Sequence, residues 1–431
     1  MRQNVFRLVW HFILALCLTV EASAENYKSL QKFLSTPNAT YQISANYDLG
    51  GKTFRVPKNC VLNFVGGSIK NGHVEYDNTL INGQCIIDCT CSGDLANDIV
   101  TPQMYGARGD GKHDDTKAFE ALNGKDVYIP TGTYIVSHVE YTEPTCIRGA
   151  GTSKSVIRQS ANAACDLFVF RNPTGSILEH ICLTGNLDDK KIASEYQSLL
   201  KLYSTAGTIS GYGCSFNHIL LKKAPATGLV LLGSGSHDTM IPEATKGLWG
   251  FSMSDFNILE CGKWGMIDES SDNRFSNFYI SACGFGGMLC HSGSNLYSNF
   301  KIDGGSMGKA GKESGYDTGA LLIVQNASNL QFSNFDIQSA YYCGIKMYKC
   351  NNIRFSGDVN NCGLGTSAGT AVKLKNVRFS QFDANLFNMN YKQKYGFVLE
   401  SDCRDVDVKV YNKDSAININ KAESTCKVES K

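Results

Sequence analysis

The chain has 431 residues, of which 42% are hydrophobic, 42 are glycine and only 8 are proline. It carries 41 basic and 40 acidic residues, and this near-neutral balance excludes the strongly basic surface that non-specific nucleic-acid binding requires. The apolar content also excludes a disordered chain.

The stretch 1–24 has the pattern of a secretory signal peptide. Arg2 and Arg7 give a positive start, and the apolar stretch 9–20 is too short to cross a bilayer comfortably. The tripeptide Ala-Ser-Ala at 22–24 is a small-x-small cleavage site. We therefore expect cleavage after Ala24 and a secreted or periplasmic protein. No other apolar run has the length of a membrane helix, so we expect no membrane span.

The segment that begins near residue 105 predicts the start of a strand-rich domain. A Gly-Asp-Gly string at 109–111 favours a tight turn, and Asp114 or Asp115 can cap a short helix over 116–122. Although the acidic residues suggest a metal or catalytic site, we favour a structural role, in which the helix covers the open end of a stack of strands.

Residues 250–410 contain a repeat of about 22 residues. Its unit is close to Asn-x-x-Ser-Asn-Phe-x-Ile, and Phe256, Phe278 and Phe300 are 22 residues apart. The apolar runs are short, alternating and rich in β-branched or aromatic residues, which predicts strands rather than helices. One such coil cannot bury its own apolar face, but coils stacked about 4.8 Å apart pair their strands in parallel and enclose a core. The repeat therefore predicts a parallel β-helix, with asparagines laddered at one corner.

The stretch 105–135 and the repeats resemble the pectate lyase superfamily, which includes polysaccharide lyases, polygalacturonase-like hydrolases and phage tailspikes. The glycine-rich stretch 48–72 resembles a β-turn module that often precedes such domains in exported Bacteroidetes proteins. The resemblance implies an all-β fold, a right-handed single-stranded parallel β-helix with a short N-terminal capping helix. It divides the chain into a signal peptide (1–24), a β-turn module (25–100) and a β-helix domain (101–431).

The catalytic strings of that superfamily are missing. The chain has no Gly-Asp-Asp, Gly-His-Gly or Arg-Ile-Lys of the hydrolases, and no Arg-x-Pro-x-x-Arg of the lyases. The resemblance therefore implies the fold and a polysaccharide or oligosaccharide partner, but no catalytic residue.

The repeat predicts which side chains share a face. If the repeat phenylalanines point inward, the residues after them form an outward column, because side chains alternate along a strand. Two aspartates on adjacent coils would then lie about 5 Å apart, the spacing of a retaining glycosidase pair, and Asp303 with Asp358 would be nearer the inverting spacing. A lysine or tyrosine in the column would give or take a proton. The column reads Leu220, Asn257, Tyr279, Lys301, Asp336, Asp358, Asp383 and Asp407, and we predict Asp303, Asp336, Lys301 and Asp358 as catalytic.

Two other interpretations of this column stay open. Parallel arginines would turn the aspartates into a structural charge ladder, and a calcium ion would also neutralise them. Apart from calcium we expect no cofactor. The arginines that precede the last three aspartates are Arg354, Arg378 and Arg404.

Three insertions, at 185–213, 223–250 and 303–319, interrupt the repeat and would wall a groove on the middle coils. Loops on a rigid repeat are where function concentrates. Aromatic residues there would stack on sugars, although a packing role is the alternative for each tryptophan. His291 and Glu260 are weaker candidates for a base and an acid. The predicted substrate-binding residues are Tyr279, Trp249, Trp264, His237 and Tyr316.

The cysteines are numerous for an exported protein of this size. Signal cleavage leaves 16 of the 17, and the spacing of Cys85, Cys89 and Cys91 is not a usual zinc pattern. Cys261 and Cys283 occupy matching positions of neighbouring repeats. Buried free thiols are the favoured interpretation, with disulfides as the alternative.

Two functions compete. The favoured one is an exported enzyme that cleaves a polysaccharide in a groove on the middle coils, as a hydrolase or as a lyase with Lys301, Tyr279 or His291 as the base. The alternative is a non-catalytic carbohydrate-binding or adhesion β-helix that resembles a tailspike. The oligomeric state is not predicted.

Overall fold

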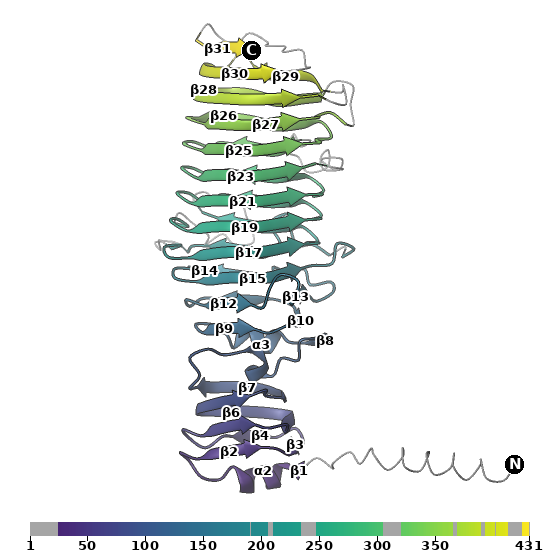
Figure 1. Ribbon diagram of the computed structural model, residues 1–431, viewed down its shortest axis with the longest axis vertical. Coiled ribbons are helices and arrows are strands. Elements are labelled where there is room, and N and C mark those ends of the chain that lie inside the picture. The colour runs from purple at the N-terminus through teal and green to yellow at the C-terminus, as the bar shows by residue number, and fades with distance from the viewer. Residues whose placement is uncertain are drawn as a thin grey trace, which may run out of the picture. The chain divides into compact units, whose positions relative to one another are not determined.

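The computed structural model describes residues 25–189, 191–205, 210–233, 247–304, 320–364, 369–388, 393–400, 402–412 and 425–430. The chain forms two compact units, Met1–Arg108 and Gly109–Lys431 (Figure 1). Across these ranges no helix is both long and apolar enough to cross a membrane.

The first unit is a small stack of parallel strands. The side chains of Asn38, Asn59 and Asn78 form a ladder, with amide-to-carbonyl distances of 2.9 and 2.8 Å, and all three residues have positive φ. Helix α2 begins at its cap, Asn26, and buries Leu30 completely. The elements are α2 (Tyr27–Phe33), η1 (Pro102–Tyr105), β1 (Glu25–Asn26), β2 (Thr40–Ile43), β3 (Asn46–Asp48), β4 (Thr53–Arg55), β5 (Val61–Phe64), β6 (Ser68–Gly83) and β7 (Ile87–Leu95).

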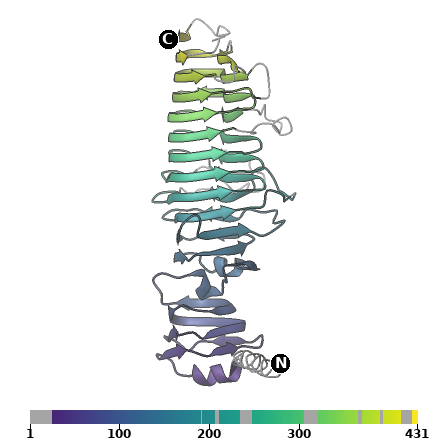
Figure 2. The same cartoon turned by 45° about the vertical axis from the view of Figure 1, so that its right-hand side comes forward.

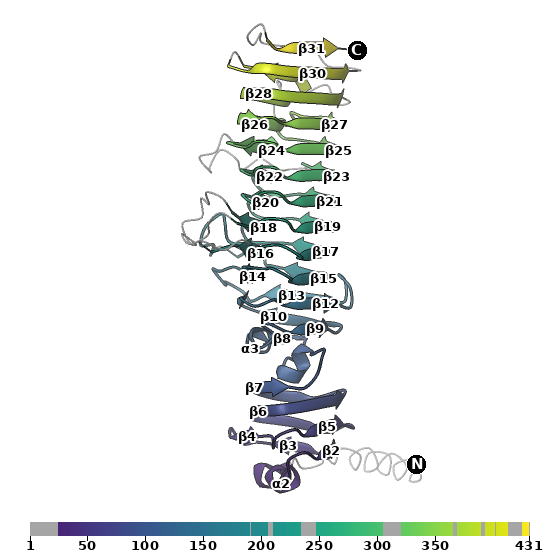
Figure 3. The ribbon, with the colours of Figure 1, turned by 90° about the vertical axis from the view of Figure 1, so that its left-hand side faces the viewer.

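The second unit is a right-handed parallel β-helix, as predicted. Long strands form one stack and short strands form another, and every pairing between consecutive coils is parallel (Figures 2 and 3). The long strands are β15 (Ile177–Thr184), β17 (Ser215–Lys222), β19 (Ser252–Leu259), β21 (Arg274–Ser281), β23 (Leu296–Asp303), β25 (Gln331–Gln338), β27 (Arg354–Asn360) and β30 (Arg404–Asn412).

The short strands alternate with the long ones along the chain. They are β14 (Phe168–Arg171), β16 (Ser198–Tyr203), β18 (Thr227–Leu232), β20 (Trp264–Asp268), β22 (Gly286–Cys290), β24 (Ala320–Gln325), β26 (Cys343–Asn351) and β29 (Gln393–Leu399). Strand β28 (Gly369–Phe387) pairs with β26 through its first half and with β27 through its second half. The remaining elements are α3 (Thr116–Glu120), β8 (Asp110–Asp114), β9 (Asp126–Ile129), β10 (Gly132–Val136), β11 (Val139–Tyr141), β12 (Cys146–Gly149), β13 (Ser155–Gln159) and β31 (Lys427–Ser430).

The repeat phenylalanines stack inside the β-helix. The ring centroids of Phe256, Phe278, Phe300 and Phe335 are 4.9, 4.7 and 5.2 Å apart along the axis, and all four rings are buried. Burying each ring contributes about 1.5–3 kcal/mol relative to an exposed one. The inward direction that the repeat predicts for these residues is therefore confirmed.

One residue bends each long strand of the middle coils. Asn277, Asn299 and Asn334 have φ of 54°, 53° and 50°, a conformation that asparagine tolerates better than most residues. Their side-chain amides are hydrogen bonded from coil to coil at 3.2 and 2.7 Å. The predicted corner ladder is thus present. The residue two positions after each bend points its side chain outward.

The predicted column is wrong beyond Asp358. The sequence pattern aligns Phe382 with Gly357, but Phe382 pairs with Phe355, so Asp383 lies opposite Ser356 rather than Asp358. Strand β27 lacks the bend asparagine, and the coil from Phe355 to Phe382 is longer than the coil from Phe332 to Phe355. Phe379 has the sequence surroundings of Phe355, an arginine before it and a serine after it, but it is not in the core. Its φ is 49° and it is 61% exposed.

Helix α3 has the predicted structural role. It ends at Glu120, earlier than expected, and its Phe119 packs on Tyr134 and Phe168 in the core. The side chain of Asp114 accepts from the Thr116 amide at 2.9 Å, while Asp115 accepts from the Gly109 amide instead.

The cysteines from Cys60 to Cys426 are free thiols, and most are buried. Cys261 and Cys283 lie in neighbouring coils, and the contact between their thiols, together with burial, raises the pKa of Cys261 well above its ordinary value. The free-thiol interpretation is confirmed for these residues, of which eleven are buried and five are partly exposed.

Candidate functional site

The predicted catalytic residues lie together on the outward side of the long strands. Tyr279, Lys301, Asp336 and Asp358 are consecutive register partners, and Asp303 lies two residues beyond Lys301 on β23. All five side chains are partly exposed. The geometric expectation that coil spacing gathers these residues on one surface is met up to Asp358.

Most of these polar groups are already paired with one another. Lys301 Nζ lies 2.9 Å from Asp336 Oδ2, and Asn360 donates to the other oxygen of Asp336 at 3.0 Å. Gln338 donates to Asp303 Oδ2 at 3.1 Å. The surface is thus a hydrogen-bonded ladder that runs from coil to coil.

The ion pair has a chemical consequence for Lys301. The hydrogen bond to Asp336 raises the pKa of the Lys301 ammonium, and the nearby charge of Asp303 adds to the effect. Lys301 therefore stays protonated at neutral pH and is unsuited to act as the base of a lyase. A role for this ladder in hydrolysis stays a prediction.

The three arginines do not form one column in this register, and the calcium alternative stays a prediction. Arg354 lies opposite Gln381, and Arg378 lies opposite Arg404, so these residues do not follow the aspartates. The part of the chain that the structure describes has no group of three or more His, Cys, Asp or Glu side chains that could hold a metal ion.

The predicted sugar-binding residues are divided between different environments. Trp264 has no exposed surface, because its ring packs on Phe285 and its Nε1 donates to Glu195 at 3.3 Å. It therefore cannot offer a ring face to a sugar in this structure. Trp249 is partly exposed and stays a prediction. His237 and Tyr316 lie outside the described residues.

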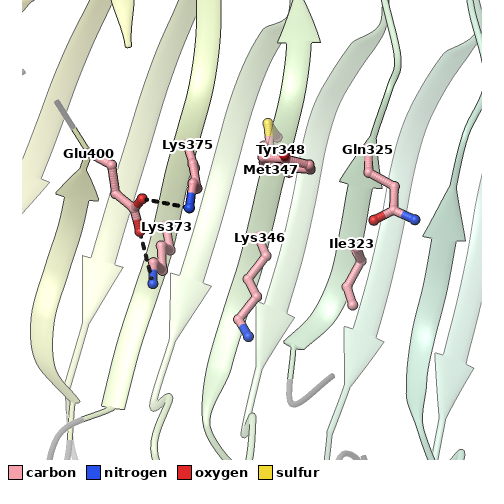
Figure 4. Close-up of a pocket in the computed structure, with 8 residues that line it drawn as sticks. All are labelled: Ile323, Gln325, Lys346, Met347, Tyr348, Lys373, Lys375 and Glu400. Atoms are coloured by element: carbon pink, nitrogen blue, oxygen red, sulfur yellow. Dashed lines mark ion pairs between the residues drawn. The ribbon is translucent and has the colours of Figure 1, made fainter. Parts of the chain in front are cut away.

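A groove that the sequence analysis missed lies on the outward side of the short strands. It has a volume of about 260 Å³, and its residues come from β24, β26, β28 and the position directly after β29 (Figure 4). Register places Ile323, Lys346 and Lys373 in one column, and Gln325, Tyr348 and Lys375 in the next. We call this the lysine groove; it is lined by Ile323, Gln325, Lys346, Met347, Tyr348, Lys373, Lys375 and Glu400.

The lysine groove is cationic. Glu400 is its one carboxylate, and it lies 3.1 Å from Lys373 Nζ and 3.5 Å from Lys375 Nζ. Lys375 also approaches the ring of Tyr348, which is 37% exposed. A partly exposed aromatic side chain in a groove lined by three lysines suits a sugar ring that carries a negative charge.

A weak sequence signal for this groove exists. The separation of Lys346 from Lys373 along the chain equals that of Tyr348 from Lys375. Both equal the length of the coil from Phe355 to Phe382. The short strands carry no Asn-Phe motif, so the repeat that revealed the long strands did not align them.

The fold that carries these surfaces is a right-handed parallel β-helix. A family model described as "Rhamnogalacturonase A/epimerase, pectate lyase-like" matches residues 100–201. The preneck appendage protein of Bacillus phage PZA is 44% identical over 62 residues, which are 14% of this chain and 7% of the phage protein.

Solved structures resemble a larger part of the chain. The enzymatically active domain of tailspike protein 2 from bacteriophage CBA120 has a TM-score of 0.62 at 15% identity, covering 77% of this chain and 52% of that chain. The A-module of the mannuronan C-5 epimerase AlgE6 from Azotobacter vinelandii has a TM-score of 0.51 at 13% identity, covering 77% and 99%. At these identities the likeness establishes the fold. The chain spans only 7% of the phage appendage protein and about half of the tailspike chain.

Proposed function

We propose that this protein is an exported carbohydrate-active β-helix that binds an acidic polysaccharide in the lysine groove. The observation that carries the proposal is the groove itself, which Lys346, Lys373 and Lys375 line together with the exposed side chain of Tyr348. A polyuronate presents one carboxylate on each sugar, and successive coils present ammonium groups at a regular spacing along the axis.

The named activities of similar proteins agree with this substrate class. Mannuronan is a polyuronate, and the epimerase neighbour acts on it by name. Since that likeness extends only to the fold, the proposal rests on the charges and the shape of the groove. A tailspike-like adhesion protein would use the same groove for binding without cleavage.

Neutralising the groove lysines is expected to weaken binding of polygalacturonate and alginate. In the variant Lys346→Gln/Lys373→Gln/Lys375→Gln, we expect the affinity to fall by about 10-fold or more at low salt, since each exposed ion pair contributes about 0.2–1 kcal/mol. Wild-type binding should also weaken as salt is added, because surface charges are screened. Isothermal titration calorimetry measures both effects.

Glu400 provides a variant with the opposite sign. Glu400→Gln removes the carboxylate that pairs with Lys373 and Lys375, so we expect tighter polyuronate binding by a few-fold. The matched control for the groove-lysine triple variant is the exposed triple variant Lys32→Gln/Lys58→Gln/Lys70→Gln in the first unit, because both remove three positive charges. Equal weakening by the two triple variants, or unchanged affinity in the groove variant, would rule out the lysine groove as the binding site.

A further inference from the structure

One corner of the β-helix carries two histidines where later coils carry asparagine. His180 in β15 and His218 in β17 lie opposite one another in the register of these neighbouring strands (Figure 1). Both residues are exposed, and their φ values are 57° and 51°. The next coil places Asp255 at this corner, and the bend asparagines follow from Asn277 onward.

The two imidazoles stack on one another. Their ring centroids are 4.6 Å apart, and the ring planes are inclined by 22°. Within the described residues neither ring forms a hydrogen bond or an ion pair. The bend asparagines differ, because their amides are hydrogen bonded from coil to coil at 3.2 and 2.7 Å. The positive φ explains a residue such as asparagine or histidine at each corner. It does not explain two exposed rings in contact whose nitrogens have no protein partner.

We propose that His180 and His218 together bind one divalent transition-metal ion of the class of Zn²⁺, Ni²⁺ and Cu²⁺. Neutral imidazole is a favoured ligand of these ions. Zn–N bonds are about 2.0–2.1 Å long, so two nitrogen ligands of one ion lie about 3.4 Å apart. The exposed rings reach this separation by rotating slightly from the stacked position. The pair supplies two ligands, and water completes the coordination.

The charged groups beside the pair are compatible with a cation. Asp255 is the next residue of the corner column, so it brings a negative charge one coil from His218. Arg148 lies opposite Glu179, the residue before His180, and its Nε is 2.8 Å from a Glu179 carboxylate oxygen. The arginine charge is therefore compensated. Because the two ligands come from different coils, only the folded chain brings them together, and a bound ion stabilises the fold.

Isothermal titration calorimetry of the full chain with Zn²⁺ alone tests the site. Asparagine is the suitable replacement, because later coils carry it at this corner. We expect His180→Asn and His218→Asn each to lose one bound ion, or to weaken its binding by about 10-fold or more. The double variant should lose no more than either single variant, because one ion needs both rings. His138→Asn, which removes another exposed histidine of the β-helix, is the matched control and should bind as the wild type does.

Two further readouts distinguish a shared ion from separate histidines. Electron paramagnetic resonance of the wild type with one equivalent of Cu²⁺ should show two coordinated imidazole nitrogens, and the single variants should lose this signal. The melting temperature of the wild type should rise by several degrees with excess Zn²⁺, whereas the rise in His180→Asn and in His218→Asn should be smaller.

Three results would overturn the inference. The first is equal Zn²⁺ binding by the wild type and the corner variants. The second is a loss of two ions in the double variant against one in each single variant, which indicates two independent histidines. The third is a copper signal with one imidazole nitrogen in the wild type. None of these results bears on polyuronate binding, because the lysine groove is built from other strands.

Discussion

Replacing Asp268 with alanine is expected to lower the free energy of unfolding by about 3–5 kcal/mol, because it removes a fully buried carboxylate from a network of donors. Asp268 points into the β-helix, opposite in direction to Glu269. Its oxygens accept from the Ser270 amide at 2.8 Å and from the Asn295 amide group at 2.9 Å. The Ser270 and Tyr297 hydroxyls donate to it as well. Chemical denaturation, monitored by circular dichroism, measures the loss.

The same carboxylate predicts a dependence of stability on pH. Burial raises the pKa of Asp268 above its ordinary value of 3.8, with Cys290 and Tyr297 as the neighbouring titratable groups. The folded chain therefore takes up this proton before the unfolded chain does. The resulting stabilisation is complete below the ordinary pKa and is lost as the pH rises through the folded-state pKa.

The variant Asp268→Asn isolates this effect, because asparagine does not titrate. We expect the melting temperature of the wild type, relative to that of Asp268→Asn, to rise as the pH is lowered from neutral toward the ordinary pKa of an aspartate. A difference that stays constant or shrinks over this range would contradict the raised pKa.

The second large effect concerns an ion pair buried on the outward side of the short strands. Lys201 is 1% exposed and lies between Val169 and Val230 in the register of β14, β16 and β18. Its Nζ is 3.0 Å from Asp166 Oδ2, and the other oxygen of Asp166 accepts from the Ser198 amide at 2.8 Å. Removing one partner of such a pair costs about 3–5 kcal/mol, because the remaining charge loses its counter-charge in an apolar environment.

We therefore expect Asp166→Ala to destabilise the protein by that amount, and Lys201→Met to cost less, because methionine matches the apolar neighbours. The double variant should regain at least half of the loss caused by Asp166→Ala alone. Denaturant titration of the four proteins completes the cycle. Losses that simply add would show that the two charges are not coupled.

The sequence predicted the β-helix because one side of each coil carries a regular motif. Phe256, Phe278 and Phe300 gave the coil length, and coil length alone brought Tyr279, Lys301 and Asp336 together on one surface. The prediction failed where a coil changed length. The absence of the bend asparagine from β27 and the longer coil that follows moved Asp383 out of the column.

The lysine groove was not found in the same way. The short strands repeat a glycine followed by apolar residues, at Gly228, Gly265 and Gly287 among others, but this motif does not predict their outward residues, which change from apolar to cationic along the axis. Leu289 and Ile323 are buried there, and the equivalent positions of the next two coils carry Lys346 and Lys373, which line the groove together with Ile323. The role of a residue on this face therefore depends on what covers it, which strand periodicity does not encode.

The burial of Trp264 illustrates the same limit. Its place near a long insertion suggested a sugar platform, but Glu195 and Phe285 enclose the ring. Glu195 comes from an earlier coil and Phe285 from the following one. No local sequence pattern therefore predicts that these two residues enclose Trp264.

The central claim is that polyuronate binds on the short-strand face, and a crystal structure of the protein with an acidic oligouronate tests it most directly. We expect the oligosaccharide to lie along the coil axis, with its carboxylates beside Lys373 and Lys375 and a sugar ring against Tyr348. An oligosaccharide bound instead beside Lys301 and Asp336 on the long strands would contradict the claim.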